Sequence, residues 1–266
     1  MQLRSLKLFL LLAVFNLVPF SANAGAPAFT NLTPAQTDAA FKNFAAAFSF
    51  KPMEPASHYG MMGFSFGVIA SLASTSVIKD AIPGGSFPSY LPSADIYLGF
   101  QLPAGVALEG GFVPNIKAGS TKLSKQGINL KWVPTATMMM LPVSVAIRGT
   151  YSRSKISYQQ TKDSVTADVT YKGSYYGANA SVGLPIPFIE PYAGIGFIHD
   201  SSTLGVSGSA TFFDQNYTSS STANSEHTSF WFYAGAELKL AFLTLTPQYD
   251  HMFESNVYSA KLGFKF

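Results

Sequence analysis

The chain contains no cysteine, which excludes disulfide bonds, thiolate metal sites and a lipid anchor on an amino-terminal cysteine. It also has no long apolar run after its first two dozen residues, so no later segment is predicted to cross a membrane as a helix. Charged residues make up only 12% of the chain, and a formal net charge of +3 gives nucleic-acid binding little electrostatic basis. Because 47% of the residues are still hydrophobic, the apolar side chains must be spread along the chain in short segments.

The amino-terminal residues have the pattern of a secretory signal peptide. Arg4 and Lys7 precede an apolar stretch over residues 8–20, and Ala22 and Ala24 form a small-x-small cleavage site. We therefore expect residues 1–24 to be removed on export. The loss of these two basic residues lowers the formal charge from +3 to +1.

One helix is predicted, over residues 34–51. Thr33 and Gln36 have the spacing of a capping box, Pro34 suits the first helical position, and Pro52 stops the helix. Three aromatic side chains lie along one side of it, namely Phe41, Phe44 and Phe48. This apolar side needs a surface to pack against.

The last segment of the chain alternates between apolar and polar residues with a period of two. Lys261 and Lys265 fall on the polar face, and the chain ends at Phe266. The apolar face holds Tyr258, Ala260, Leu262, Phe264 and Phe266. This alternation predicts a strand with one apolar side, and the chain ends here with nothing left to cover that side. We therefore interpret the apolar side as lipid-facing and expect the strand to pair with the first strand of a closed barrel.

From residue 58 onward, similar segments follow one another, separated alternately by short turns and long polar loops. They predict an all-β domain over residues 58–266, a single antiparallel transmembrane barrel of ten strands. An apolar stretch over residues 206–213 leaves twelve strands open as an alternative. In the sixth segment the apolar residues change parity between Tyr171 and Ala178, which we interpret as a β-bulge at Gly173 or Gly177.

With its final strand ending in Phe266 and its Pro-Tyr-Ala-Gly-Ile-Gly-Phe run over residues 191–197, the chain resembles Gram-negative outer-membrane β-barrel proteins, in particular uncharacterised families of unknown function. The resemblance implies a place in the outer membrane, with both termini in the periplasm. It also implies contact with outer-membrane lipids, and recognition by the barrel-assembly machinery of a signal in the last strand formed by Tyr258, Phe264 and Phe266.

The inward positions of the predicted strands carry charges of both signs in equal number. The acidic members are Asp95, Glu109, Glu190, Glu237 and Asp250, and the basic members are Lys131, Arg148, Lys239, Lys261 and Lys265. Since opposite charges buried together neutralise one another, this balance indicates a salt-bridged lumen more than a strongly ion-selective pore.

The predicted helix has two possible positions. Within a periplasmic-side segment over residues 25–57, it could rest at the periplasmic mouth or in the lipid interface, or it could fold back as a plug inside the lumen. Residues 52–57 are short enough to keep the helix beside the first strand and long enough to let it enter the mouth. Phe41, Phe44 and Phe48 would be buried in either case.

Two functional classes are compatible with these patterns. One is a narrow channel or transporter for small solutes, and the other is a structural or adhesive barrel with a filled lumen. A remote third is a lipid esterase or deacylase, because His199 and Ser201 share a lipid-facing side and resemble the arrangement in outer-membrane lipid hydrolases. We expect no enzymatic activity and no cofactor, because no further residue matches that arrangement and Ser201 opens a Ser/Thr-rich loop. We also expect no metal site, since His58, His227 and His251 are scattered along the chain.

Basic residues gather in two predicted outer loops. They are Lys117, Lys122, Lys125, Arg153, Lys155 and Lys162. They could bind phosphates of lipopolysaccharide, or they could simply be solvated loop charges. The sequence leaves this choice open, together with the oligomeric state.

Overall fold

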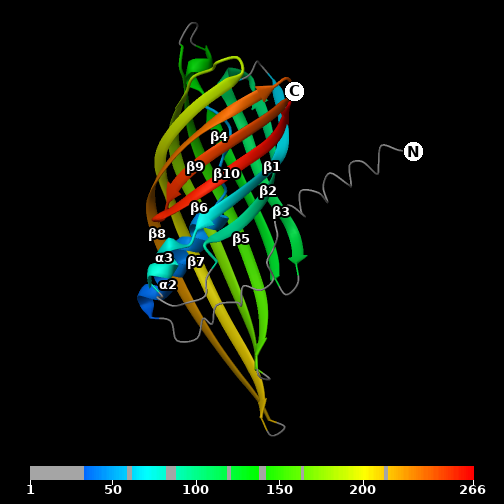
Figure 1. The fold of residues 1–266 in the computed structure, drawn as a ribbon, viewed down its shortest axis with the longest axis vertical. Coiled ribbons are helices and arrows are strands. Elements are labelled where there is room, and N and C mark those ends of the chain that lie inside the picture. The colour runs from blue at the N-terminus through cyan, green and yellow to red at the C-terminus, as the bar shows by residue number, and fades with distance from the viewer. Residues whose placement is uncertain are drawn as a thin grey trace, which may run out of the picture.

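The computed structural model describes residues 33–58, 62–81, 88–118, 121–137, 142–162, 165–212 and 215–266. The predicted signal peptide therefore lies outside the described residues. Ten antiparallel strands form a closed barrel in which β1 pairs with both β2 and β10 (Figure 1). The ten-strand prediction is confirmed, and the twelve-strand alternative is wrong. None of the helices in the described ranges is long and apolar enough to span a membrane.

The strands follow the chain in order around the barrel. They are β1 (Gly63–Ser74), β2 (Tyr90–Leu102), β3 (Val106–Ala118), β4 (Thr121–Trp132), β5 (Ser144–Lys162), β6 (Val165–Gly183), β7 (Ile189–Phe212), β8 (Gln215–Leu240), β9 (Leu243–Met252) and β10 (Ser255–Lys265). The helical elements are α2 (Pro34–Phe48), α3 (Ser76–Ala81), and the short 3-10 turns η1 (Pro103–Gly105) and η2 (Pro134–Thr137). The strands β5 to β8 are much longer than the others. They extend beyond the barrel, and β7 and β8 stay paired as far as Phe212 and Gln215.

The two ends of the barrel differ. One end holds η1, η2, the turn over residues 184–188 and Phe266, and we call it the carboxy-terminal end. The other end holds α3, the β9–β10 turn and the extension of β5 to β8, and we call it the helix end because α2 lies there (Figure 1). The predicted long loops at the helix end are mostly wrong, because β3 to β8 extend through the residues expected to form them and leave two residues between β3 and β4, β5 and β6, and β7 and β8. The long connection at this end covers residues 75–89 and contains α3.

The outward side chains form an apolar belt and the inward ones are largely polar. Half-exposed outward residues include Phe100, Leu130, Trp132, Ile147, Ile195, Phe197, Phe230 and Leu262. Between β1 and β10, Phe66 stacks on Phe264 with ring centroids 5.1 Å apart. An apolar outer belt around a polar interior is the pattern of barrels that span a membrane with their strands.

The sixth strand has no bulge. β6 pairs without a register shift with β5 and β7 along its whole length, so Val169, Tyr171, Tyr175 and Asn179 all face inward. The interpretation of its parity change as a bulge is therefore wrong. Val169 and Tyr171 point into the barrel because they pack against Phe41 of α2.

The capping box at the start of α2 is present. The Gln36 N–H donates to Thr33 Oγ1 at 3.3 Å, and the Thr33 N–H donates to Gln36 Oε1 at 3.0 Å. The helix ends at Phe48 and not at the predicted residue 51, because Ser49 adopts an extended conformation with φ −64° and ψ 148°. From there the chain runs on without regular structure into the barrel.

Candidate functional site

An amino-terminal segment fills the interior of the barrel. It consists of α2, which we call the plug helix, and residues 49–57, which we call the strap. All nine strap residues are buried. The plug helix contacts β1, β2 and β10 on one side of the barrel and β6, β7 and β8 on the other, so it lies across the opening at the helix end.

The prediction that the helix and the carboxy-terminus share one end of the barrel is wrong. Asn43 fixes the helix at the opposite end, where its amide donates to Ser255 Oγ at 2.7 Å and to the Ser74 carbonyl at 3.0 Å. Its Oδ1 accepts from the Ile78 N–H at 2.9 Å. The strap was expected to hold the helix beside the start of β1. The strap is instead extended. It passes along the lumen, so the plug helix and the start of β1 lie at opposite ends of the barrel.

The aromatic side of the plug helix packs against the inner face of the long strands. Phe41 and Phe44 lie 6.2 Å and 5.0 Å from the Tyr171 ring, measured between centroids. Phe48 joins a buried cluster that includes Tyr175 and Trp231. The three phenylalanines thus find the surface they need on inward side chains of the barrel wall.

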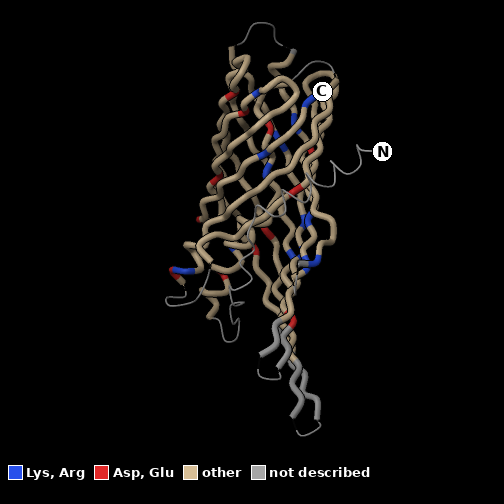
Figure 2. Tube along the Cα trace, turned by 45° about the vertical axis from the view of Figure 1, so that its right-hand side comes forward, with Lys and Arg blue, Asp and Glu red and all other residues tan. Residues whose placement is uncertain are grey.

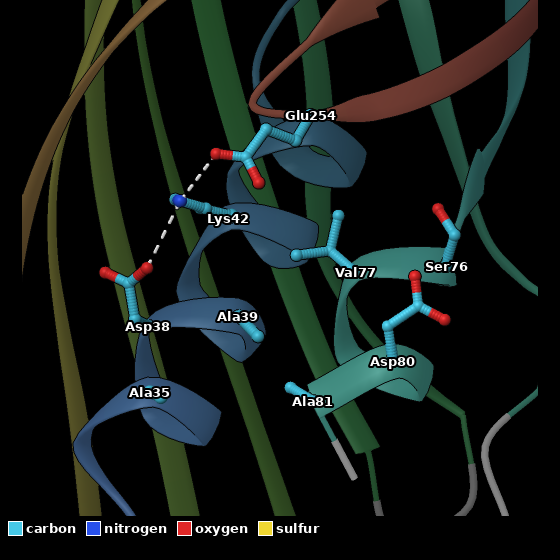
Figure 3. Close-up of a pocket in the computed structure, with 9 residues that line it drawn as sticks. All are labelled: Ala35, Asp38, Ala39, Lys42, Ser76, Val77, Asp80, Ala81 and Glu254. Atoms are coloured by element: carbon cyan, nitrogen blue, oxygen red, sulfur yellow. Dashed lines mark hydrogen bonds and ion pairs between the residues drawn. The ribbon is translucent and has the colours of Figure 1, made fainter. Parts of the chain in front are cut away.

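Ion pairs tie the outer part of the plug helix to neighbouring elements. Lys42 Nζ lies 3.3 Å from Asp38 and 2.7 Å from Glu254 in the β9–β10 turn (Figure 3). The hydrogen bond to Glu254 raises the pKa of Lys42. Asp38 also bonds His227 Nε2 of β8 at 2.5 Å. A hollow of about 410 Å³ lies beside these groups, between the plug helix, α3 and Glu254.

Phe50 of the strap occupies a space that two glycines leave open. A Cβ atom on Gly111 would lie 2.3 Å from Phe50 Cε2, and one on Gly127 would lie 2.5 Å from Phe50 Cβ. Both glycines face inward from β3 and β4, which pair at these residues. Their lack of a side chain lets the strap pass close to the wall.

Glu54 is the main charged contact of the strap. Its carboxylate forms ion pairs with Lys261 and, at 2.6 Å, with Lys265. Burial works against ionisation, but these two lysines together lower the pKa of Glu54 well below its ordinary value. The side chain is therefore a carboxylate at neutral pH, held inside the barrel by two cations of β10.

Two further basic side chains hold the strap backbone. Arg148 donates to the carbonyls of Glu54 and Pro55 at 2.6 Å and 2.9 Å, and also to Ser181 and Tyr233. Lys131 donates to the carbonyls of Pro55 and Ser57 at 3.3 Å each. Toward the carboxy-terminal end the strap is thus held by these polar contacts, while Phe50 and Met53 pack with Ile69 and Tyr97 in an apolar cluster.

The ten charged residues predicted to line the lumen all belong to inward-facing positions, and most of them are paired. The ion pairs are Lys131 with Glu109 at 3.4 Å, Lys239 with Glu190 at 2.6 Å and Lys265 with Glu237 at 2.6 Å, while Asp250 accepts from the Trp231 indole at 3.0 Å. Figure 2 shows basic and acidic residues interspersed along the barrel. The lumen therefore holds a connected polar network.

Three charged members of this network were not predicted from the sequence. Lys125 was placed in an outer loop, but it lies inside and pairs with Asp95 at 2.7 Å. Its position follows from the alternation of β4, which begins earlier than predicted. Lys51 was placed at the end of the predicted helix and Glu54 in the short linker that follows it, so neither was assigned to the lumen. Burial, and the nearby Lys125, lower the pKa of Lys51 to about 7.

His199 and Ser201 lie on the outer side of β7, as predicted. His199 bonds Thr228 Oγ1 of β8 at 2.8 Å and its ring lies against Tyr176. Ser201 is exposed at the next outward position. The contacts described for the His199 side chain are therefore with Thr228 and Tyr176 and not with Ser201.

We expect replacement of Ser201 by Ala to leave membrane lipids unchanged. An esterase would need this hydroxyl as its nucleophile, so the native protein and the S201A variant can be compared by lipid mass spectrometry. Acyl-chain release by the native protein that S201A abolishes would contradict this expectation.

The residues of the predicted assembly signal lie on the outer face of the last strand. Tyr258 is half exposed, Phe264 packs on Phe66, and Phe266 is largely exposed beyond β10. The backbone of Phe266 pairs with Phe64 at the start of β1. The closing strand is therefore paired through its backbone and presents its aromatic residues on the outside of the barrel.

A closed antiparallel barrel with an apolar belt and a polar interior defines the class of outer-membrane β-barrel proteins. The chain belongs to a family of unknown function, DUF6588, whose profile matches residues 61–266. That match begins after the strap, so it covers the barrel wall and leaves out the plug helix.

Solved structures of this class resemble the chain at low identity. Ail, the attachment invasion locus protein of Yersinia pestis, is 14% identical over 77% of this chain and 97% of its own, with a TM-score of 0.32. The outer membrane protease OmpT from Escherichia coli is 6% identical over 77% and 94%, with a TM-score of 0.44. The KdgM porin is 8% identical over 76% and 99%, with a TM-score of 0.34. No curated protein matches the chain by sequence.

Proposed function

We propose that this protein is an outer-membrane channel for small solutes that its own amino-terminal segment closes. The observation that carries the proposal is the nature of the strap contacts. Glu54 and the backbone of residues 54–57 are held by Lys131, Arg148, Lys261 and Lys265, through ion pairs and hydrogen bonds. Water and solutes can replace such contacts, whereas a segment that only fills a core needs apolar packing throughout.

The proposed orientation places the carboxy-terminal end in the periplasm. Short turns at that end and long extensions at the other match the usual arrangement of these barrels. The plug helix then lies at the outer mouth, where a solute arriving from outside would meet it first. The extension of β5 to β8 would stand above the membrane.

We also propose three partners for the outer surface. The apolar belt contacts membrane lipids, and the assembly machinery recognises the last strand through Tyr258, Phe264 and Phe266. Lipopolysaccharide phosphates contact basic residues near the helix end, where Lys117 lies opposite Lys122 and Lys155 lies opposite Lys172. Lys125 is not among them, because its side chain is inside the barrel.

The second candidate is a structural or adhesive barrel whose lumen is permanently filled. The burial of the whole strap and of Phe41 favours it. The two candidates differ in whether the strap can leave its position without unfolding the wall.

A single methyl group can test the channel proposal. We expect Gly111→Ala to increase the time that refolded protein conducts in a planar bilayer, because the new Cβ would overlap the Phe50 ring at 2.3 Å. The adjacent Gly110→Ala is the matched control, since a Cβ there meets nothing closer than 3.6 Å. Silent recordings from both variants, with both barrels folded, would favour the permanently filled barrel.

A further inference from the structure

We propose that the lumen at the level of Glu54 is a binding site for small carboxylate solutes, and that the Glu54 side chain is its built-in occupant. This inference rests on the proposed channel function and names the chemical class of solute. The strap would then close the channel by occupying, with its own carboxylate, the site that the solute uses.

The barrel wall around Glu54 carries more positive than negative charge. Lys131, Arg148, Lys261 and Lys265 all bond the strap there, and the nearby wall carboxylates that pair with the lysines are Glu109 and Glu237. Within the described ranges Arg148 makes no ion pair with a carboxylate, and its partners are Ser181, Tyr233 and two strap carbonyls. Four cations thus face two wall carboxylates, and the strap supplies the third carboxylate.

Other charges at this level cancel. Glu190 pairs with Lys239 at 2.6 Å and accepts from the Ser57 N–H at 3.2 Å. This pair contributes no net charge to the wall. The excess of positive charge therefore belongs to the four side chains that hold the strap.

The other charged level of the lumen has the opposite sign, and the strap matches it too. Asp95 and Asp250 face inward there together with Lys125, and the strap residue near them is Lys51, whose amine donates to the Ser49 carbonyl at 3.1 Å and whose charged form these two carboxylates favour. A strap that merely filled space would need no such match. The agreement of sign at both levels indicates that the strap substitutes for mobile ions.

When the strap leaves, the wall loses the negative charge that balances its cations. Buried cations without a counter-charge are strongly unfavourable, so an anion should enter in its place. The geometry favours a carboxylate, because one oxygen of Glu54 pairs with Lys261 and the other with Lys265. Arg148 is left to bind a second acceptor of the same solute.

The experiment uses the full-length protein with Glu54→Gln, recorded in planar bilayers across a KCl gradient. The amide keeps the size of the side chain and removes its charge, so the strap should be released more often. We expect currents whose reversal potential indicates anion-over-cation permeability on the order of tenfold, because excess charge in a narrow lumen concentrates counter-ions. Added succinate should reduce the chloride current by competing for the lysines.

The matched control carries Lys261→Gln and Lys265→Gln in addition to Glu54→Gln, and it should conduct without anion preference and without succinate block. If the Glu54→Gln variant does not fold, Glu54→Asp replaces it in the same recordings. The shorter carboxylate of Asp cannot pair with both lysines, so the strap should again be released more often. Currents that are cation-selective or insensitive to succinate would overturn the carboxylate site and leave the channel intact. Silence of all these folded variants would overturn the proposed channel itself.

Discussion

Deletion of residues 25–57, with the signal sequence kept, is expected to convert a mostly closed barrel into a steadily conducting one. The deletion removes the plug helix, which lies across the helix end, and the strap, which runs along the lumen. It leaves all ten strands and their pairings in place. Single-channel recording of the refolded variant beside the full-length protein measures the effect.

The expected size of the effect follows from the contacts that are lost. Burial of Phe41 and Phe48 stabilises the docked segment by roughly 1.5–3 kcal/mol each, before any polar contact is counted. After the entropy of ordering the segment is subtracted, a docking free energy of about 3 kcal/mol corresponds to an open fraction below about 1%. The deletion should therefore raise the average current on the order of a hundredfold.

Folding must be checked separately. The deletion variant should still migrate differently before and after boiling, as closed barrels do in detergent. A folded variant whose permeability equals that of the full-length protein would show that the amino-terminal segment does not close the lumen.

The substitution Arg148→Met is expected to have the second-largest effect. The guanidinium is fully buried and donates to two strap carbonyls, at 2.6 Å and 2.9 Å. Hydrogen bonds from a charged group contribute about 1.5–3 kcal/mol each, so the docked strap should lose about 3 kcal/mol or more. The closed-to-open ratio should then fall on the order of a hundredfold.

Arg153→Met provides the control on the same strand. Arg153 is exposed on the outer side of β5, where its guanidinium lies 5.3 Å from the Tyr151 ring centroid. We expect this variant to gate like the native protein in bilayer recordings. Equal behaviour of R148M and R153M would show that the strap does not depend on Arg148.

The wall of the barrel could be predicted from the sequence because successive side chains of a strand point to opposite faces, so apolar and polar residues alternate along it. The alternation alone assigns Phe64 and Phe66 to the outer face and Ile69 to the inner face, and no knowledge of the neighbouring strands is needed. The same alternation in the last segment, which ends at Phe266, indicated that this segment is a strand that pairs with β1 and closes the barrel. Strand number and the positions of the ten lumen charges followed from these faces.

The contents of the barrel could not be predicted in the same way. Period-two alternation says that Tyr171 lies on one face of β6, but only the presence of Phe41 inside makes that face apolar and inward. Glu54 and Lys51 lie in a segment without regular structure, so no periodicity assigns them to the lumen. The lysines of β10 that pair with Glu54, and the carboxylates Asp95 and Asp250 near Lys51, are distant in the sequence, and a single sequence does not pair them.

The most direct test of the central claim asks whether the strap lies inside the barrel in the outer membrane. A Cβ atom on Gly183 would lie 3.2 Å from Ala56 Cβ, close to the separation of a disulfide, and the chain has no cysteine of its own. Ala56→Cys with Gly183→Cys is therefore tested in intact cells under mild oxidation. A protease site inserted at residues 119–120 cuts the chain between the two cysteines after extraction.

We expect the two fragments to stay joined until a reductant is added. The control pair Ala56→Cys with Gly149→Cys should give separate fragments, because a Cβ on Gly149 meets nothing within 4 Å and points away from the lumen. Separate fragments from the 56/183 pair, in a barrel that is otherwise folded, would contradict the placement of the strap in the lumen.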